Sequence, residues 1–108
     1  MSQNSITAKL HPEMIRAMFD CGKKQTSRFN RLGNPGDTIT LTHPETDEQR
    51  SWIITGIPQH TLGHIAMHMY RQEGFISESD FMQFWAKIYP TKCSAELLLD
   101  VHLLKEAK

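Results

Sequence analysis

Residues 22–28 combine the side-chain types of a site that binds or transforms anions. The segment holds three cations and two hydroxyls, on Lys23, Lys24, Thr26, Ser27 and Arg28. In an extended strand Lys24, Thr26 and Arg28 point to the same face. Such a row can bind a phosphate or stabilise an oxyanion, and a Thr hydroxyl beside a desolvated Lys is a candidate nucleophile. The alternative is a solvated loop that enters a strand.

Glu73 is the second candidate, because it breaks a local preference. It lies at the expected end of a helix, where the helix dipole disfavours an acid by roughly 0.3–1 kcal/mol. Residues that contradict local rules occur at functional sites. The alternative is an exposed Glu73 that is solvated or weakly paired with Arg71.

Three histidines, His60, His64 and His68, follow one another at intervals of four residues. Two histidines spaced in this way on a helix can bind a transition metal. His60 is expected to precede the helix, however, and no carboxylate completes a known catalytic-metal pattern. We therefore expect a polar helix flank, with no metal and no cofactor.

The aromatic residues divide into core candidates and stacking candidates. Phe81, Phe84 and Trp85 share the spacing of one helical face and are expected in the core. Trp52 and Phe75 fall outside that periodicity. They are the better candidates for a wall on which a nucleobase stacks.

The elements that position these residues can be predicted from periodicity and turn chemistry. Helices are expected between Leu10 and Gly22, between Pro58 and Gly74, and between Ser77 and Pro90. Extended segments are expected at Lys24 to Phe29, Thr38 to Thr42, Trp52 to Ile57 and Ala95 to Leu104, with a loop at His43 to Ser51. A terminal helix competes with the last strand. The pattern is typical of an α+β domain around a small, mostly antiparallel sheet or barrel.

Length and charge restrict the function further. The chain has 108 residues, the size of one domain, with 12 basic and 12 acidic residues. Zero net charge argues against a broad grip on duplex DNA and is compatible with a local nucleotide pocket. No apolar run is long enough to span a membrane. Residues 1–4 are polar, unlike a secretory signal, so we expect a cytoplasmic protein with Cys21 and Cys93 reduced.

In their order, these motifs resemble the ASCH (activating-signal-cointegrator homology) family, whose domains have a PUA-like fold. The resemblance runs from Ile6 to Leu104. The motifs are Gly22 to Arg28, the Pro35–Gly36–Asp37 turn, Glu73–Gly74–Phe75, the acidic helix start at Ser77 to Asp80, and Phe84 to Pro90. The resemblance implies one domain with a small β-barrel of mixed, mostly antiparallel strands and flanking helices.

The resemblance also implies binding of RNA or a nucleotide in a cleft between barrel and helices. The residues expected to contact nucleic acid are Lys23, Lys24, Arg28, Arg31 and Phe75. Small bacterial members include N4-acetylcytidine amidohydrolases and ribonucleases. By motif, the catalytic Lys of the amidohydrolases falls on Lys24 and their Glu on Glu73. Their Thr falls on Thr26 if this chain lacks one residue of the segment, and on Ser27 otherwise.

Three hypotheses follow: a binding module, a small hydrolase, and an interaction protein that keeps only the fold. Geometry discriminates between them. Catalysis requires Lys24, Thr26 and Glu73 to converge within about 3–4 Å.

Overall fold

The computed structural model describes residues 5–7 and 10–107 of the chain. In chain order the elements are β1 (Ser5–Thr7), α1 (Pro12–Asp20), β2 (Gln25–Arg28), β3 (Thr38–Thr42), β4 (Gln49–Gly56), β5 (Gln59–Thr61), α2 (Leu62–His68), α3 (Glu78–Ile88) and β6 (Leu98–Ala107). The polar residues 1–4, on which the expectation about a signal segment depends, lie outside the described ranges.

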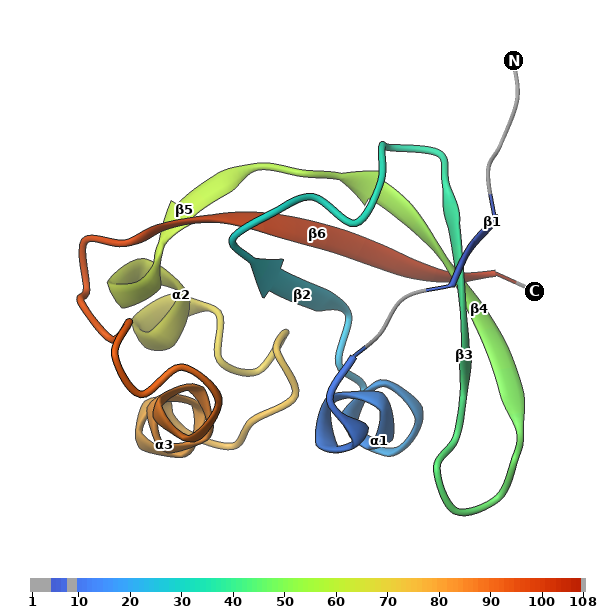
Figure 1. The fold of residues 1–108 in the computed structure, drawn as a ribbon, viewed down its shortest axis with the longest axis horizontal. Helices are drawn as coiled ribbons and strands as arrows, with labels where there is room; N and C mark the ends of the chain where they lie inside the picture. The colour runs from blue at the N-terminus through green and yellow to red at the C-terminus, as the bar shows by residue number, and fades with distance from the viewer. Residues whose placement is uncertain (1–4, 8–9, 108) are drawn as a thin grey trace.

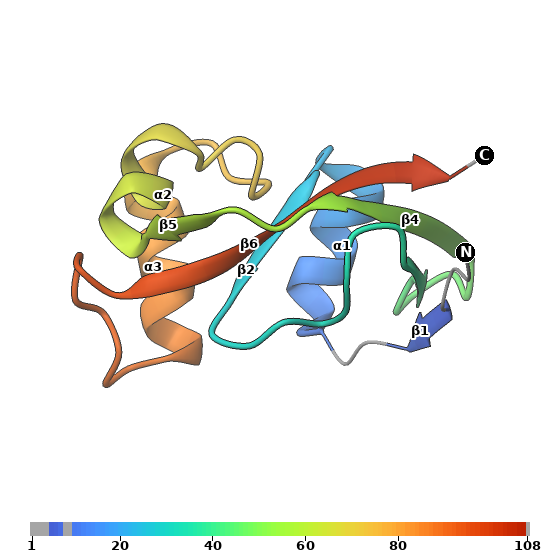
Figure 2. The ribbon, with the colours of Figure 1, turned by 90° about the horizontal axis from the view of Figure 1, so that it is seen from above.

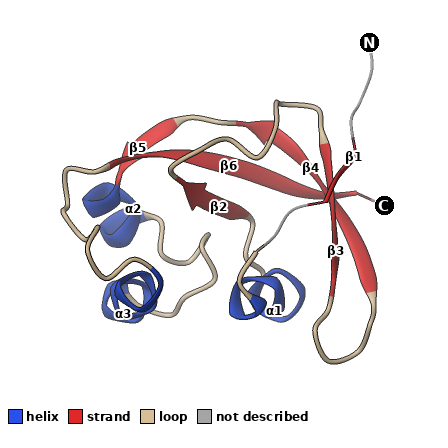
Figure 3. Cartoon of the chain, viewed as in Figure 1, coloured by secondary structure: helices blue, strands red, loops and turns tan. Residues whose placement is uncertain are grey.

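One curled sheet holds all six strands, and the helices lie along one side of it (Figures 1 and 3). The strand order is β1-β3-β4-β6-β2, with β5 also paired to β6. Only the β1–β3 pair is parallel among these pairs. The long strand β6 pairs with β2, β4 and β5, so it crosses the whole molecule (Figure 2). The predicted α+β class with mostly antiparallel strands is confirmed.

The strands match their predicted positions best where side chains alternate. β3 coincides with the predicted Thr38 to Thr42, with Ile39 and Leu41 buried. β4 begins at Gln49, inside the segment expected to be loop, because its first residues pair with the end of β3. The short strand β5 was not predicted. The C-terminal segment is a strand, which rejects the helix alternative.

The helices begin where capping residues predict and do not all end where expected. Pro12 opens α1, and Ser77 caps α3 by accepting a hydrogen bond from the Asp80 amide at 3.1 Å. α2 ends at His68, well before Gly74. Residues 69–75 instead form a turn-rich loop that runs towards α1 and β2 (Figure 1).

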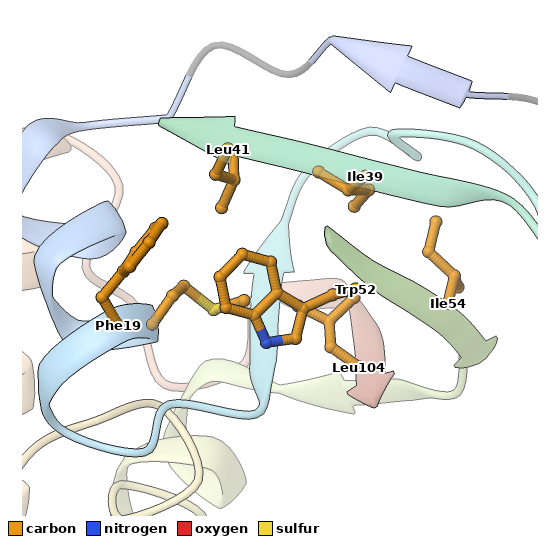
Figure 4. Close-up of a cluster of buried hydrophobic side chains, with 7 residues drawn as sticks. Phe19, Ile39, Leu41, Trp52, Ile54 and Leu104 are labelled. Atoms are coloured by element: carbon orange, nitrogen blue, oxygen red, sulfur yellow. The ribbon is translucent and has the colours of Figure 1, made fainter. Parts of the chain in front are cut away.

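Two separate hydrophobic clusters stabilise the fold. The Trp52 core joins α1 to β3, β4 and β6, and its members are Met18, Phe19, Ile39, Leu41, Trp52, Ile54 and Leu104. Figure 4 labels all of them except Met18. The Trp85 core joins α2 and α3 to the start of β6, through Leu62, Ile65, Ala66, Phe81, Trp85, Leu99 and Val101. Trp52 is only 3% exposed, so the prediction that it forms a stacking wall is wrong. Among the described residues, no helix has the length and apolarity to cross a membrane.

Candidate functional site

The loop of residues 69–75 is fastened to the segment that leads from α1 into β2. Gly22 has a φ of +69°, and the Lys23 amide donates to the Ala17 carbonyl at 3.1 Å. The Lys24 and Gln25 amides both donate to the Gln72 carbonyl, at 2.8 and 3.2 Å. Segments about fifty positions apart in sequence therefore share a backbone connection.

Gly74 allows this close approach. Its φ is +96°, a conformation that L side chains rarely adopt. A Cβ atom there would lie 3.0 Å from the Cβ atoms of both Ala17 and Lys23. The glycine thus lets the loop press against α1, which brings the neighbouring Glu73 beside Lys23.

Glu73 is the centre of a buried group that we call the polar cluster: Lys23, Gln25, Ser27 and Glu73. Its Oε1 accepts a hydrogen bond from Lys23 Nζ at 2.9 Å. Its Oε2 accepts from Gln25 Nε2 at 2.8 Å and from Ser27 Oγ at 2.6 Å. Lys23 Nζ also donates to the Glu73 carbonyl at 3.0 Å. Glu73 is 2% exposed, which excludes the alternative of a solvated surface acid.

The predicted catalytic trio does not converge. Lys24 is exposed, and Lys23 makes the ion pair with Glu73 that Lys24 was expected to make. Thr26 is fully buried, but its Oγ1 has no hydrogen-bond partner among the described residues. Ser27, the alternative to Thr26, is the hydroxyl that reaches Glu73. Successive residues of an extended segment face opposite sides, so Lys23 and Ser27 share one face, and Lys24 and Thr26 share the other. The wrong one of these two faces was predicted from the sequence.

A cavity of about 250 Å³ opens beside the polar cluster. It lies between the start of α1, the end of β2 and the end of α3, and its lining residues are Leu10, His11, Met14, Ser27, Arg28, Ile88 and Tyr89. Ser27 is therefore common to the cavity wall and the polar cluster. Arg28 forms no salt bridge with any described residue, although Asp100 is its partner in the β2–β6 register.

The other predicted nucleic-acid contacts lie away from this cavity. Lys23 is buried in its ion pair, and Lys24 and Arg31 are exposed but do not line the cavity. Phe75 is half-buried, with its ring centroid 5.5 and 5.3 Å from those of Phe81 and Phe84. Of the five predicted residues, Arg28 alone is on the cavity wall.

Sequence reasoning missed Gln25, His11 and Tyr89. Gln25 lies two residues before Ser27 and so on the same face of β2. Choosing that face from the sequence would have indicated Gln25 as well. His11 lies at the expected start of the helix between Leu10 and Gly22, where a histidine is an unusual capping residue and could have been the signal. Nothing in the sequence pattern distinguishes Tyr89 from a core aromatic residue.

His102 is a buried histidine that holds the chain after β2 in place. Its Nε2 accepts a hydrogen bond from the Leu32 amide at 2.9 Å, so its Nδ1 donates to the Thr26 carbonyl at 3.1 Å. Burial lowers the pKa of His102, and the nearby Arg28 charge lowers it further. The ring is therefore kept neutral, in the tautomer with the proton on Nδ1.

The histidine series does not gather around a common point. As expected, His60 precedes α2, and the ring centroids of His60, His64 and His68 lie 4.8 and 4.9 Å apart in sequence order. In the part of the chain that the structure describes, no three His, Cys, Asp or Glu side chains are grouped so as to hold a metal ion. Cys21 and Cys93 are exposed, free thiols.

No protein-family model matches the sequence, and no curated protein matches it either. Two solved structures share the fold. The ASCH domain from Lactobacillus crispatus JV V101 superposes with a TM-score of 0.76 at 9% sequence identity, over 95% of this chain and 79% of that one. ASCH from Zymomonas mobilis superposes with a TM-score of 0.61 at 15% identity, over 96% of this chain and 68% of that one. The resemblance is confirmed at the level of the fold: a curled, mostly antiparallel half-barrel with flanking helices, as in ASCH and PUA-like domains.

Proposed function

We propose that this ASCH-fold domain binds a nucleotide, free or within single-stranded RNA, in the cavity between α1, β2 and α3. The observation that carries the proposal is that Ser27 and Arg28 both line that cavity. Arg28 has no acidic partner among the described residues, and an unpaired guanidinium is well suited to a phosphate.

The rest of the cavity wall suits a nucleoside. Leu10, Met14 and Ile88 supply apolar surface for a base or a sugar. Tyr89, whose ring packs against Phe29 and Trp85, adds aromatic surface to the same wall. Ligand sites are mostly apolar with a few convergent polar groups. The volume of about 250 Å³ lies just below the usual range of roughly 300–1,000 Å³, so the cavity fits part of a nucleotide better than the whole of one. The polar cluster holds Ser27 from behind, so its hydroxyl has a fixed orientation.

Binding of the four ribonucleoside 5′-monophosphates and of short single-stranded RNA tests the proposal by calorimetry. Arg28→Ala is expected to weaken binding roughly 10- to 100-fold, because a charge-assisted hydrogen bond contributes about 1.5–3 kcal/mol. Lys105→Ala is the matched control, since it also removes one positive charge but from an exposed position outside the cavity. Added salt should weaken binding to the wild type.

The absence of binding by any nucleotide or RNA at millimolar concentration would refute the proposal. Equal losses in Arg28→Ala and Lys105→Ala would also refute it, because they would indicate general electrostatic attraction rather than a site.

The second candidate function is hydrolysis of an N-acylated nucleoside such as N4-acetylcytidine. It is favoured by the 2.6 Å hydrogen bond from Ser27 Oγ to Glu73 and by Lys23 on the other carboxylate oxygen. This is the arrangement of a nucleophile, a general base and a positioning cation.

In that reaction, Ser27 Oγ would attack the acyl carbon while its proton passes to Glu73. Glu73 would then protonate the departing amine as the carbon–nitrogen bond breaks, which leaves an acyl-serine. Water would hydrolyse this ester by the same route, restoring Ser27 and releasing the acid. Lys23 would keep Glu73 oriented without exchanging a proton.

Acetate release from N4-acetylcytidine, measured beside cleavage of labelled RNA, tests this candidate. Ser27→Ala and Glu73→Gln should each reduce turnover by at least 100-fold, whereas Thr26→Ala should not. A folded wild-type protein that leaves both substrates intact would remove the hydrolase from consideration and leave the binding proposal standing.

A further inference from the structure

His11 is an unusual residue for the position it occupies. It caps the N-terminus of α1, where its Nδ1 accepts a hydrogen bond from the Glu13 amide at 3.2 Å. Helix N-caps are preferentially Ser, Thr, Asp or Asn. The other two helices follow that preference, with Thr61 on α2 and Ser77 on α3. A smaller side chain would cap α1 at least as well, so capping alone does not explain the imidazole.

The surroundings fix both the orientation and the tautomer of this imidazole. Because Nδ1 accepts a hydrogen bond, the proton of the neutral ring is on Nε2. The ring packs edge to face on Phe84, with centroids 5.4 Å apart and planes at 86°. Nε2 has no hydrogen-bond partner among the described residues. His11 thus carries a preset donor that no other described residue accepts.

His11 also lines the same 250 Å³ cavity as Ser27 and Arg28. The Ser27 hydroxyl donates its hydrogen bond to Glu73, because a carboxylate can only accept. The lone pairs of Ser27 Oγ therefore remain available to a ligand. Arg28 supplies charge. The neutral side-chain donors on the wall are therefore His11 Nε2–H and the Tyr89 hydroxyl, and His11 is the one whose tautomer is set by a hydrogen bond to its other ring nitrogen.

We propose that His11 is a specificity-determining residue whose Nε2–H donates to a carbonyl oxygen on the base of the bound nucleotide. The inference rests on the proposed function and deepens it, because it divides the cavity into two parts. Arg28 contacts the phosphate, and His11 contacts the base. The α1 cap then serves the site as well as the helix.

Two substitutions separate the donor from the other roles of His11. His11→Asn keeps a good N-cap and removes the ring, whereas His11→Phe keeps the packing on Phe84 and removes the cap and the donor. Both should weaken binding of a nucleotide by roughly 3- to 10-fold, the range of one neutral hydrogen bond. Thermal unfolding should distinguish them, with His11→Asn at least as stable as the wild type. Thr61→Asn, the same kind of cap exchange on α2, should leave binding unchanged.

Nucleosides that lack the phosphate complete the experiment. The losses caused by His11→Asn and His11→Phe should be the same for uridine as for uridine 5′-monophosphate, because their contact is to the base. The loss caused by Arg28→Ala should appear with the nucleotide and disappear with the nucleoside.

The outcomes distinguish this inference from the function on which it rests. Wild-type affinity in His11→Asn, with Arg28→Ala still impaired, refutes the role of His11 and leaves the nucleotide site intact. A His11→Asn loss that appears only with the nucleotide also refutes it, because the contact would then be to phosphate. No binding by the wild type refutes both.

Discussion

The Trp52 core and the polar cluster are both sealed from solvent, but they are built from opposite chemistry. The core consists of apolar side chains from α1 and three strands, which contribute burial of apolar surface (Figure 4). The polar cluster buries an ammonium, a carboxylate, an amide and a hydroxyl within hydrogen-bonding distance of one another. A buried ion pair of this kind is often no more stabilising than apolar residues of the same volume.

We interpret the Trp52 core as serving stability and the polar cluster as a support for the proposed nucleotide site. The polar cluster joins the chain after α1 to the loop after α2, and one of its members lies on the wall of the cavity. Three side chains donate to the Glu73 carboxylate, and the Ser27 hydroxyl is one of them, so its orientation is set by the 2.6 Å bond to Oε2. That orientation is what an apolar replacement would lose.

The largest expected effect comes from breaking the ion pair on one side only. Glu73→Leu leaves the buried Lys23 cation without its carboxylate, with only the main-chain carbonyl of residue 73 as an acceptor, which should lower the free energy of unfolding by about 3–5 kcal/mol. Adding Lys23→Met should recover most of that loss, because two apolar side chains then pack together. Urea unfolding at neutral pH measures both changes.

The double variant sharpens the comparison between the two regions. It should fold and yet bind nucleotide more weakly than the wild type, since Ser27 loses its acceptor. If the double variant is as unstable as Glu73→Leu, the polar cluster is a structural element like the core, and its interpretation as a functional support is wrong.

A smaller effect is expected from the buried His102. Its pKa lies below the ordinary value of 6.5, so the folded protein favours the neutral ring more than the unfolded chain does. This contribution to stability is complete above about pH 6.5 and is lost as the pH falls from there through the lowered pKa. Protonation would also place a hydrogen on Nε2, opposite the Leu32 amide that donates to it.

Unfolding at pH 7.5 and at pH 5.0 measures the contribution of His102, with His102→Gln as the control. The acidic residues titrate in both proteins, so the difference between their pH dependences isolates the histidine. The wild type should lose more stability than His102→Gln on acidification. Equal losses would contradict the assignment of His102 as a neutral buried ring.

The smallest expected change in stability comes from replacing Lys24. Its neighbour Lys23 is expected to give one of the largest. Lys24→Ala should change the free energy of unfolding by less than about 0.5 kcal/mol, because Lys24 is exposed. Lys23→Ala should lower it by about 3–5 kcal/mol, because it leaves the buried Glu73 carboxylate without its cation. Denaturant unfolding of the two variants, measured side by side, checks directly which of the two lysines is buried against Glu73. Similar values for both would place the ion pair elsewhere.

The sequence predicts the elements that local rules determine. Alternation defined β3 to the residue, and Ser77 with its acidic neighbours defined the start of α3. The end of α2 and the strand β5 were not predictable in this way. They depend on contacts with β6 and on the backbone bonds to Gln72, which no local pattern carries.

The sequence also pointed to two segments that the structure brings together, but in one of them it favoured the wrong face of a strand. Glu73 and the segment after α1 do meet, as the resemblance implied, although α2 ends at His68 and Glu73 is therefore not at the end of a helix. The choice of Lys24 and Thr26 over Lys23 and Ser27 was an error of one residue in phase. In a strand such a shift exchanges the two faces, and the phase of β2 is set by its pairing with β6 and by the loop at Gln72.

The central claim is that a nucleotide occupies the cavity between α1, β2 and α3. Titration of a ribonucleoside 5′-monophosphate into isotopically labelled protein, followed by amide chemical shifts, tests it most directly. The account predicts saturable shifts at His11, Ser27, Arg28 and Tyr89, with the outer face of β3 and β4 unchanged. Shifts confined to that outer face, or no shifts at millimolar nucleotide, would contradict it.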